Sequence, residues 1–306
     1  MIWEKLGRIW EPKADKWWNF KYAMLPVPMY FEDKNIVRVF FGSADKNIFS
    51  RISFIDLNPS NLLQIVGQSE EPVLDIGEIG TFDDSGVVPS CVLHKDNKIY
   101  LYTVGFQRCE RVPYMLFAGL AESLDQGLSF KRTSRAPILP RADFRPTSQG
   151  APSVLFHEGR YKMWHWFSTK WIDVNGKLFL DYKIGYAESQ DAIHWEMKDI
   201  TCIAPDPSND EFAVARPWVI FENGKFRMWY SIRFITKMYR IGYAESSDGL
   251  IWNRMDNDAG IDVSAEGWDS EMVCYPAVIN IEKERYLFYN GNNNGVNGFG
   301  VARLIQ

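Results

Sequence analysis

Acidic side chains recur at one position of a repeated pattern, a few residues before a proline that starts an apolar stretch. Asp210 and Asp269 both lie seven residues before their proline. The acids that stand before Pro89, Pro217 and Pro276 are Asp83 and Asp84, Asp210 and Glu211, and Asp269 and Glu271. Carboxyl groups facing a ligand can act as a general acid and a general base. The plainer alternative is a turn role, since an aspartate in a loop can bond its own backbone.

Several other residues that could bind a ligand stand on the same stretches. Three converging carboxylates would be costly if they were buried, charged and without partners, so a functional purpose is expected for the group. An exposed indole face suits the C–H surface of a sugar. A histidine within an aromatic strand is more often a hydrogen-bonded structural residue than a catalyst. The further candidates are Trp17, Trp18, Lys21, Arg145, Gln149, His165 and Arg216.

These candidates must be positioned by a unit that the chain repeats. "DYKIGYAESQDAIHWEMKD" returns some residues later as "MYRIGYAESSDGLIWNRMD". Each copy has an apolar strand containing a proline, a short polar turn, an aromatic strand, a strand of small residues, and then S-x-D followed by an aromatic residue. Five copies are found, with their prolines at positions 26, 89, 152, 217 and 276.

The repeat predicts an all-β fold. Short polar turns between β-rich runs favour antiparallel hairpins, and no stretch has a helical period. Repeated four-stranded sheets arranged radially form a β-propeller, here a single five-bladed domain over residues 1–306. We expect blades at roughly 20–75, 83–140, 147–206, 210–265 and 269–306, the last completed by residues 2–10, which closes the ring. An immunoglobulin-like array is disfavoured because Gly/Pro linkers between the copies are missing.

The S-x-D element has a structural interpretation. In "SLDQGLSF" we expect Ser123 and Asp125 to bond the turn backbone and Phe130 to pack between blades. The segment also fits the box found in sialidases, which lies on an outer hairpin. The strongest repetition in the chain is therefore predicted to be architecture and not chemistry.

Composition excludes several function classes. The 306 residues carry a formal net charge of −5 and no strongly basic run, so nucleic acid is not an expected partner. No segment is apolar enough for a signal sequence or a membrane span. Four scattered cysteines without a C-x-x-C pair favour a reduced, cytoplasmic protein. No metal or other cofactor is predicted, and oligomeric state is left open.

The repeat resembles the five-bladed β-propeller glycosidases, which include the arabinanase/xylosidase, invertase/levansucrase and mannoside phosphorylase families. The resemblance spans the whole chain and rests on "GRYKMWHW", "GKFRMWYS" and "RYLFYNG", each preceded by the proline strand. It implies a carbohydrate substrate in an axial pocket ringed by acids from successive blades. The chain departs from the families in one respect, because the first copy brings no acid before its proline and the usual positions hold Ser90, Ser153, Trp218 and Ala277.

On this resemblance the leading hypothesis is cleavage or transfer of a glycosidic bond. Glu211 is the predicted general acid, Asp84 the predicted base, and Glu271 a third acid or a ligand of a sugar hydroxyl. Arg216 would hold a hydroxyl, carboxylate or phosphate. The other predicted substrate contacts are His165, Arg145, Asp83, Asp269, Gln149, Trp18 and Lys21.

Three alternatives stay open. In a phosphorylase, inorganic phosphate replaces the attacking water, and Arg145, Arg216, Lys21 and His165 would cradle it. In a non-catalytic sugar-binding protein, the acids and tryptophans only bond and stack. A protein-interaction propeller would instead expose an apolar patch on one rim.

Overall fold

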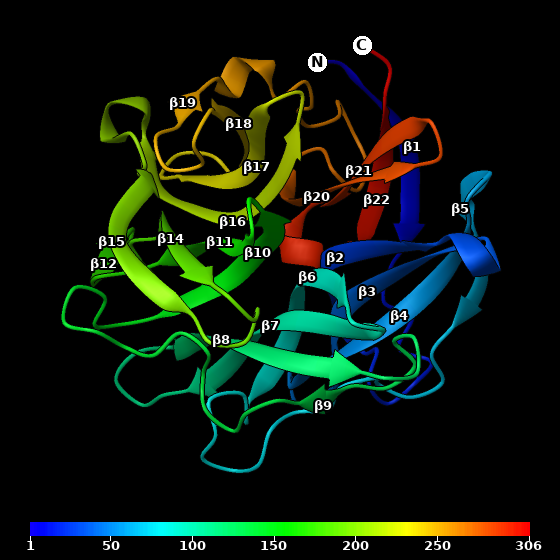
Figure 1. The fold of residues 1–306 in the computed structure, drawn as a ribbon, viewed down its shortest axis with the longest axis horizontal. Helices are drawn as coiled ribbons and strands as arrows, with labels where there is room; N and C mark the ends of the chain where they lie inside the picture. Colours follow the sequence, from blue (N-terminus) through cyan, green and yellow to red (C-terminus); the bar gives the residue numbers. More distant parts are fainter.

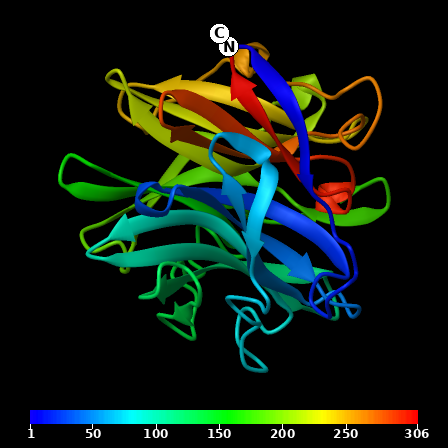
Figure 2. The ribbon, with the colours of Figure 1, turned by 90° about the vertical axis from the view of Figure 1, so that its right-hand side faces the viewer.

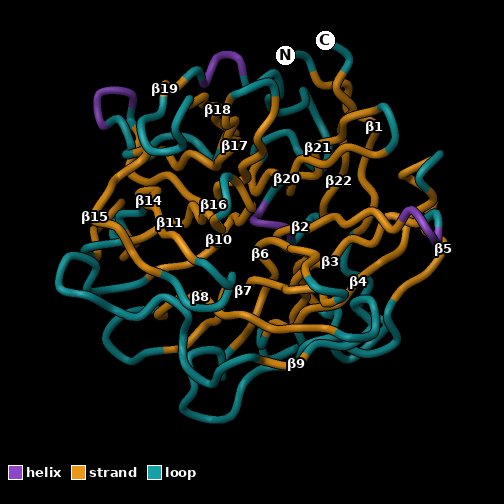
Figure 3. Tube along the Cα trace, in the orientation of Figure 1, coloured by secondary structure: helices purple, strands orange, loops and turns teal.

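The computed structural model describes residues 1–306 and is built almost entirely from strands (Figure 1). It contains 22 strands and four short 3-10 helices, which Figure 3 marks in purple. This agrees with the predicted all-β class, since the runs rich in valine, isoleucine and aromatic residues form the strands. None of the helices is both long and apolar enough to cross a membrane.

The strands fall into groups of consecutive antiparallel neighbours. The first group is β2 (Lys21–Phe31), β3 (Ile36–Ala44), β4 (Ser50–Asn58) and β5 (Asn61–Gln68). The second is β6 (Gly86–Lys95), β7 (Lys98–Arg108), β8 (Tyr114–Ser123) and β9 (Lys131–Arg132). The third is β10 (Gln149–His157), β11 (Arg160–Phe167), β14 (Lys183–Ser189) and β15 (Glu196–Ile203). Single parallel pairs, Ser50 with Gly86 and Phe117 with Gln149, join these three groups into one sheet.

Two further groups complete the strand list. The fourth group is β16 (Glu211–Glu222), β17 (Lys225–Phe234), β18 (Arg240–Ser246) and β19 (Asn253–Arg254). The fifth is β20 (Cys274–Ile281), β21 (Glu284–Asn290), β22 (Phe299–Leu304) and β1 (Trp3–Trp10). A separate hairpin, β12 (Trp171–Val174) with β13 (Lys177–Leu180), is inserted between β11 and β14. The short helices are η1 (Glu32–Lys34), η2 (Pro207–Asn209), η3 (Asp256–Asp258) and η4 (Asn293–Gly295).

Both ends of the chain lie in the fifth group. β1 pairs antiparallel with β22, from Trp3 opposite Leu304 to Trp10 opposite Phe299. This is the pairing expected for residues 2–10. The two termini lie side by side in both views (Figures 1 and 2).

The hydrophobic core lies between neighbouring strand groups. One cluster joins Phe40 of the first group to Leu101 of the second, and another joins Trp164 of the third to Phe226 of the fourth. Because each group is apolar on both faces, its strands read as nearly continuous hydrophobic runs. This packing fixes the position of every inner strand relative to the next.

The S-x-D turn has the structural role predicted for it. Ser123 Oγ accepts from the backbone N–H of Gly127, and Asp125 Oδ1 accepts from those of Leu128 and Ser129. Phe130 packs edge-to-face on Phe40 of the preceding group, with ring centroids 5.4 Å apart. The same bonds recur in the later copies, where Ser189 and Ser246 take the place of Ser123. The prediction is confirmed.

Candidate functional site

A cavity opens where the first strands of the five groups meet. These strands, β2, β6, β10, β16 and β20, gather around the centre of the molecule (Figure 1). The cavity measures about 450 Å³ and is lined by 24 residues. This size lies within the usual range for small-molecule sites. As expected, the residue immediately before the proline lines the cavity in every copy: Leu25, Val88, Ala151, Arg216 and Tyr275.

A backbone distortion aims these side chains at the cavity. Leu25, Ala151, Arg216 and Tyr275 all have positive φ, between 47° and 56°, although none is glycine. The strand pairing shifts register at the same places, as in a β-bulge. A bulge re-aims a side chain, and a left-handed non-glycine residue costs roughly 1–3 kcal/mol. The fold therefore holds four strained residues around one cavity.

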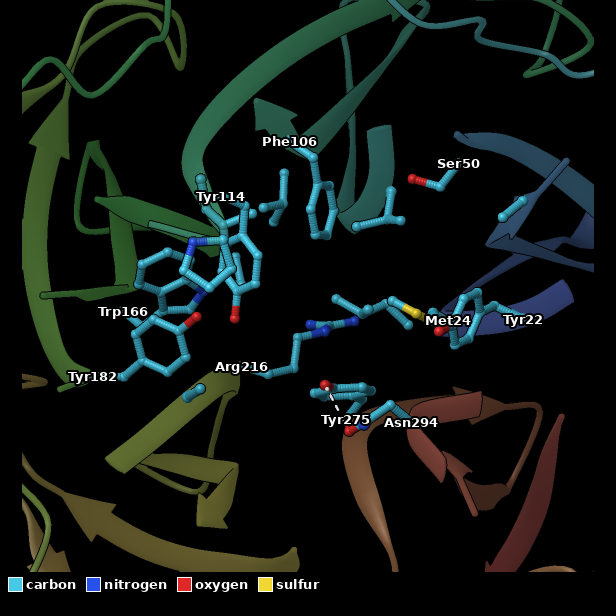
Figure 4. A pocket seen from close by; sticks show the side chains of 18 of the residues that line it. Tyr22, Met24, Ser50, Phe106, Tyr114, Trp166, Tyr182, Arg216, Tyr275 and Asn294 are labelled. Carbon is cyan, nitrogen blue, oxygen red and sulfur yellow. Dashed lines mark hydrogen bonds between the residues drawn. The ribbon is translucent and has the colours of Figure 1, made fainter. Parts of the chain in front are cut away.

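Aromatic side chains form much of the cavity wall. Trp166 and Tyr182 lie with ring centroids 4.3 Å apart, and Tyr114 and Phe106 face the same space (Figure 4). Burial raises the pKa of Tyr182 well above its usual value and that of Tyr239 to about 12. These phenols therefore stay protonated at neutral pH and can donate hydrogen bonds to a ligand. Such rings offer apolar faces with polar edges, which suits a sugar.

Arg216 extends into the middle of this wall (Figure 4). The residue is 1% exposed, and all three guanidinium nitrogens are buried without a hydrogen-bond partner. Burial lowers the pKa of Arg216 to about 10, so it is still charged at neutral pH. A buried, charged and unpaired group is costly unless something binds it. The arrangement suits an anion in the cavity, because a guanidinium can bind a carboxylate or phosphate with two parallel bonds.

Two more arginines line the cavity. Arg108 is already engaged, since its Nη2 donates to the backbone carbonyl oxygens of Asn47 and Ile48 at 2.7 and 3.0 Å. Arg233 lies among aromatic rings and forms no hydrogen bond or ion pair within the protein. The 24 lining residues include three arginines and no aspartate, glutamate, histidine or lysine. The site is therefore cationic and aromatic.

The predicted acids are not among the lining residues. Glu211 is buried and accepts from Arg254 Nη2 at 2.8 Å and from the backbone N–H of Asp206 at 2.8 Å. Asp83 is held by Arg132, at 2.6 Å, and Asp269 by Lys5, at 2.7 Å. Each acid thus has a cationic partner, so the cost of burial that suggested a functional purpose is offset locally.

The remaining acids lie on loops. Asp84 accepts from the backbone N–H of Gly80 and from Ser85 Oγ, at 2.9 and 2.7 Å. Ser85 lines the cavity, so Asp84 is one residue away from it. Glu271 is exposed, and only its backbone is hydrogen-bonded. Glu211, Asp84 and Glu271 therefore do not face one another across the cavity, and their catalytic roles stay predictions.

Arg145, His165 and Gln149 come together, but in a buried network behind the cavity. Arg145 Nη1 lies 2.9 Å from His165 Nε2 and 3.4 Å from Gln149 Oε1, while Nη2 donates to the carbonyl oxygen of Lys198 at 2.6 Å. Burial and the nearby Arg145 charge lower the pKa of His165 to about 3. Its ring is neutral at physiological pH, with Nδ1 donating to the Trp166 carbonyl oxygen and Nε2 accepting from Arg145.

The aromatic candidates of the first copy lie outside the cavity lining. Trp18 is 1% exposed and donates to the Glu70 carbonyl oxygen at 3.0 Å, which is a packing role. Trp17 is half exposed and its ring is covered by Arg51. Lys21 stacks on Tyr22, which does line the cavity. Of the eleven predicted site residues, only Arg216 contributes to the lining.

Sequence reasoning missed Arg233 and the aromatic wall. The search covered only the stretch before each proline, whereas Arg233, Trp166 and Phe106 lie on the second strand of their groups. A usable signal exists, because these residues stand near the ends of the second strands, which lie opposite the starts of the first. No group of three or more histidine, cysteine, aspartate or glutamate side chains is close enough to hold a metal ion.

One relative is similar to this chain along its full length. The uncharacterized protein Rv1502 of Mycobacterium tuberculosis strain H37Rv is 35% identical over 304 residues, which cover 99% of each chain. This chain belongs to the Rv1502 family. The MT1551 protein of strain CDC 1551 matches the Rv1502 family member equally well, also at 35% identity and 99% coverage. No family model matches.

Solved structures show that the Rv1502 family has the fold of the glycoside hydrolase-like propeller superfamily. A glycosyl hydrolase from Bacteroides ovatus superposes with a TM-score of 0.75 at 15% identity, covering 98% of this chain and 93% of that one. A thermostable family-43 glycoside hydrolase gives 0.69 at 17%, covering 94% and 90%. An α-L-arabinofuranosidase from Lactobacillus brevis gives 0.70 at 12%, covering 92% and 90%.

Proposed function

We propose that this protein binds a sugar-containing ligand with an anionic group in the central cavity. The observation that carries the proposal is Arg216, whose buried guanidinium is aimed into the cavity with no partner for any of its three nitrogens. A carboxylate or phosphate on the ligand would satisfy these donors. The aromatic wall would bind the sugar ring itself.

The fold supports a carbohydrate ligand. The structures that superpose on this chain are glycoside hydrolases, and one of them is described as a complex with a chain of RGII. We infer further that the five strand groups are the blades of a five-bladed propeller, that the pairing of β1 with β22 closes its ring, and that residues 1–306 are one domain. The cavity would then lie on the propeller axis.

Binding without hydrolysis is the function that the geometry favours. Hydrolysis by two carboxyl groups needs them on opposite sides of the scissile bond, roughly 5–10 Å apart. Glu211 is instead held by Arg254, and Glu271 points into solvent. The three protonated tyrosines Tyr182, Tyr239 and Tyr275 would serve as hydrogen-bond donors to the sugar.

Phosphorolysis is the second candidate, and Arg216 is the observation in its favour. In that reaction inorganic phosphate attacks the anomeric carbon, the glycosidic bond breaks, and the leaving oxygen takes up a proton. Arg216 would hold the phosphate, and a lining tyrosine would be the proton donor. Binding and phosphorolysis therefore share the anion site and differ in turnover.

Calorimetry with matched sugars tests the proposal. Galacturonate and a hexose monophosphate are expected to bind, and galactose to bind roughly 10-fold or more weakly, because it leaves Arg216 unpaired. Arg216→Met should abolish this preference, while Arg8→Met, on an exposed ion pair of β1, should keep it. Equal affinity for the neutral and acidic sugars in the wild-type protein would sink the proposal. Release of nitrophenol from aryl glycosides only when phosphate is present would select phosphorolysis.

A further inference from the structure

A second cavity adjoins the first. It measures about 500 Å³ and lies between the β12–β13 hairpin and the loop that follows β17. The two cavities share four lining residues, namely Phe179, Arg233, Tyr239 and Asn294. They are therefore neighbouring parts of one cleft, and a ligand in the first can extend into the second.

Arg233 stands at the junction of the two cavities. Its guanidinium carbon lies 4.5, 4.8 and 5.0 Å from the ring centroids of Phe179, Phe212 and Tyr239. These rings hold the guanidinium in place through cation–π contacts but accept no conventional hydrogen bond. No carboxylate or carbonyl oxygen of the protein accepts one from it either. The donors of Arg233 are thus positioned and free.

The second cavity is also cationic. Its lining adds Lys177 and Lys237 to Arg233 and contains no aspartate or glutamate. Lys237 Nζ lies 4.1 Å from the centroid of the Phe234 ring. Low-dielectric walls of one charge sign raise the local concentration of an oppositely charged ligand. The whole cleft, from Arg216 to Lys237, is therefore complementary to negative charge.

We propose that the cleft has a second anion subsite at Arg233, so that its ligand is a sugar-containing molecule with two separate anionic groups. This rests on the proposed function for the first group, which Arg216 would bind. Arg233 would bind the second group with two parallel N–H bonds. An oligosaccharide of acidic sugar units and a hexose bisphosphate both have this chemistry.

The subsite is tested by comparing ligands with one and with two anionic groups. The probes are galacturonate against digalacturonate, and a hexose monophosphate against a hexose bisphosphate, with affinities measured by calorimetry. The dianionic member of the preferred pair should bind roughly 10- to 100-fold more tightly than its monoanionic partner. Which pair shows the gain identifies the source of the charge, a uronate or a phosphate.

Variants assign the gain to Arg233. Arg233→Met keeps apolar bulk among the rings and should reduce the affinity for the dianion to that for the monoanion, with monoanion binding unchanged. Arg233→Lys, which keeps the charge, should restore part of the gain. Arg8→Met is the matched control away from the cleft. Melting temperatures of all variants show whether each one is folded.

The outcomes separate this proposal from the first one. If both dianions bind no more tightly than the monoanions, or if Arg233→Met weakens both members of a pair equally, the second subsite is refuted while the Arg216 site stands. If no acidic sugar binds and Arg216→Met has no effect, the proposed function itself fails.

Discussion

Arg216 and Tyr275 occupy equivalent positions on β16 and β20, and both are held in the left-handed region, with φ of 54° and 56°. Each precedes the proline of its strand, each sits at a shift in strand register, and each lines the central cavity. The repeat therefore supplies the same backbone device to different side chains. Function at this position is set by which residue occupies it, and only one copy has a charge there.

Replacing Arg216 should stabilise the free protein. Arg216→Met removes a buried charge with no partner, and such a change to an apolar residue of similar length often gains roughly 1–4 kcal/mol. Urea denaturation without ligand measures this free energy of unfolding. A structural arginine would behave in the opposite way, so a clear loss of stability would argue against the anion-binding role.

Replacing Glu211 should affect stability and not ligand affinity. Glu211→Gln weakens the buried bond with Arg254 and is expected to cost roughly 1–3 kcal/mol of unfolding free energy. Urea denaturation and calorimetry on the same sample check both parts. An unchanged stability together with lost binding or turnover would restore Glu211 as the predicted general acid.

The stability of the protein should fall in mild acid because of His165. Its folded pKa of about 3 lies below the unfolded value of about 6.5, so the unfolded chain binds the proton first. The stability that depends on neutral His165 is complete above pH 6.5 and is lost as the pH falls towards 3. At pH 5 the loss is about 2 kcal/mol relative to pH 8.

The variant that tests this source is His165→Gln, whose amide can still accept from Arg145 but does not titrate. Urea denaturation at several pH values should show a flatter dependence for it than for the wild type. His94→Gln, at an exposed position, is the control and should keep the wild-type dependence. If His165→Gln and the wild type lose stability in parallel, the assignment is wrong.

Gly298 should be essential for docking β1. Its φ is +88°, and a Cβ there would collide with the carbonyl oxygen of Trp10. Gly159 has a similar φ of +76° with open space around it. Gly159→Ala should therefore cost only the backbone strain, roughly 1 kcal/mol, and Gly298→Ala considerably more. Thermal unfolding of the two variants measures the difference, and equal melting temperatures would show that β1 gives way.

The sequence predicted the strands and the S-x-D turns because these depend on local patterns. Alternating apolar residues, prolines and polar turns act over a few positions, and Ser123 bonds within its own turn. It also indicated that the stretch before each proline matters, and Arg216 was found in that way.

The acids could not be assigned because their partners are distant in sequence. Asp83 pairs with Arg132, 49 residues away, and Asp269 with Lys5, 264 residues away. No local pattern distinguishes a carboxylate that will meet a cation from one that will face a ligand. The cost of an unpaired buried charge predicted that these acids need partners; it did not identify them. The same cost, applied to Arg216 in the structure, is what marks the cavity.

The pairing of β1 with β22 has a consequence for folding kinetics. The ion pair between Glu4 and Arg303 joins residues 299 positions apart, so this sheet forms only after almost the entire chain has been brought together. The entropy of closing so long a loop must be overcome before any of its contacts form. We therefore expect assembly of this sheet to be a late and slow step, during which β22 exposes an unpaired edge to other chains.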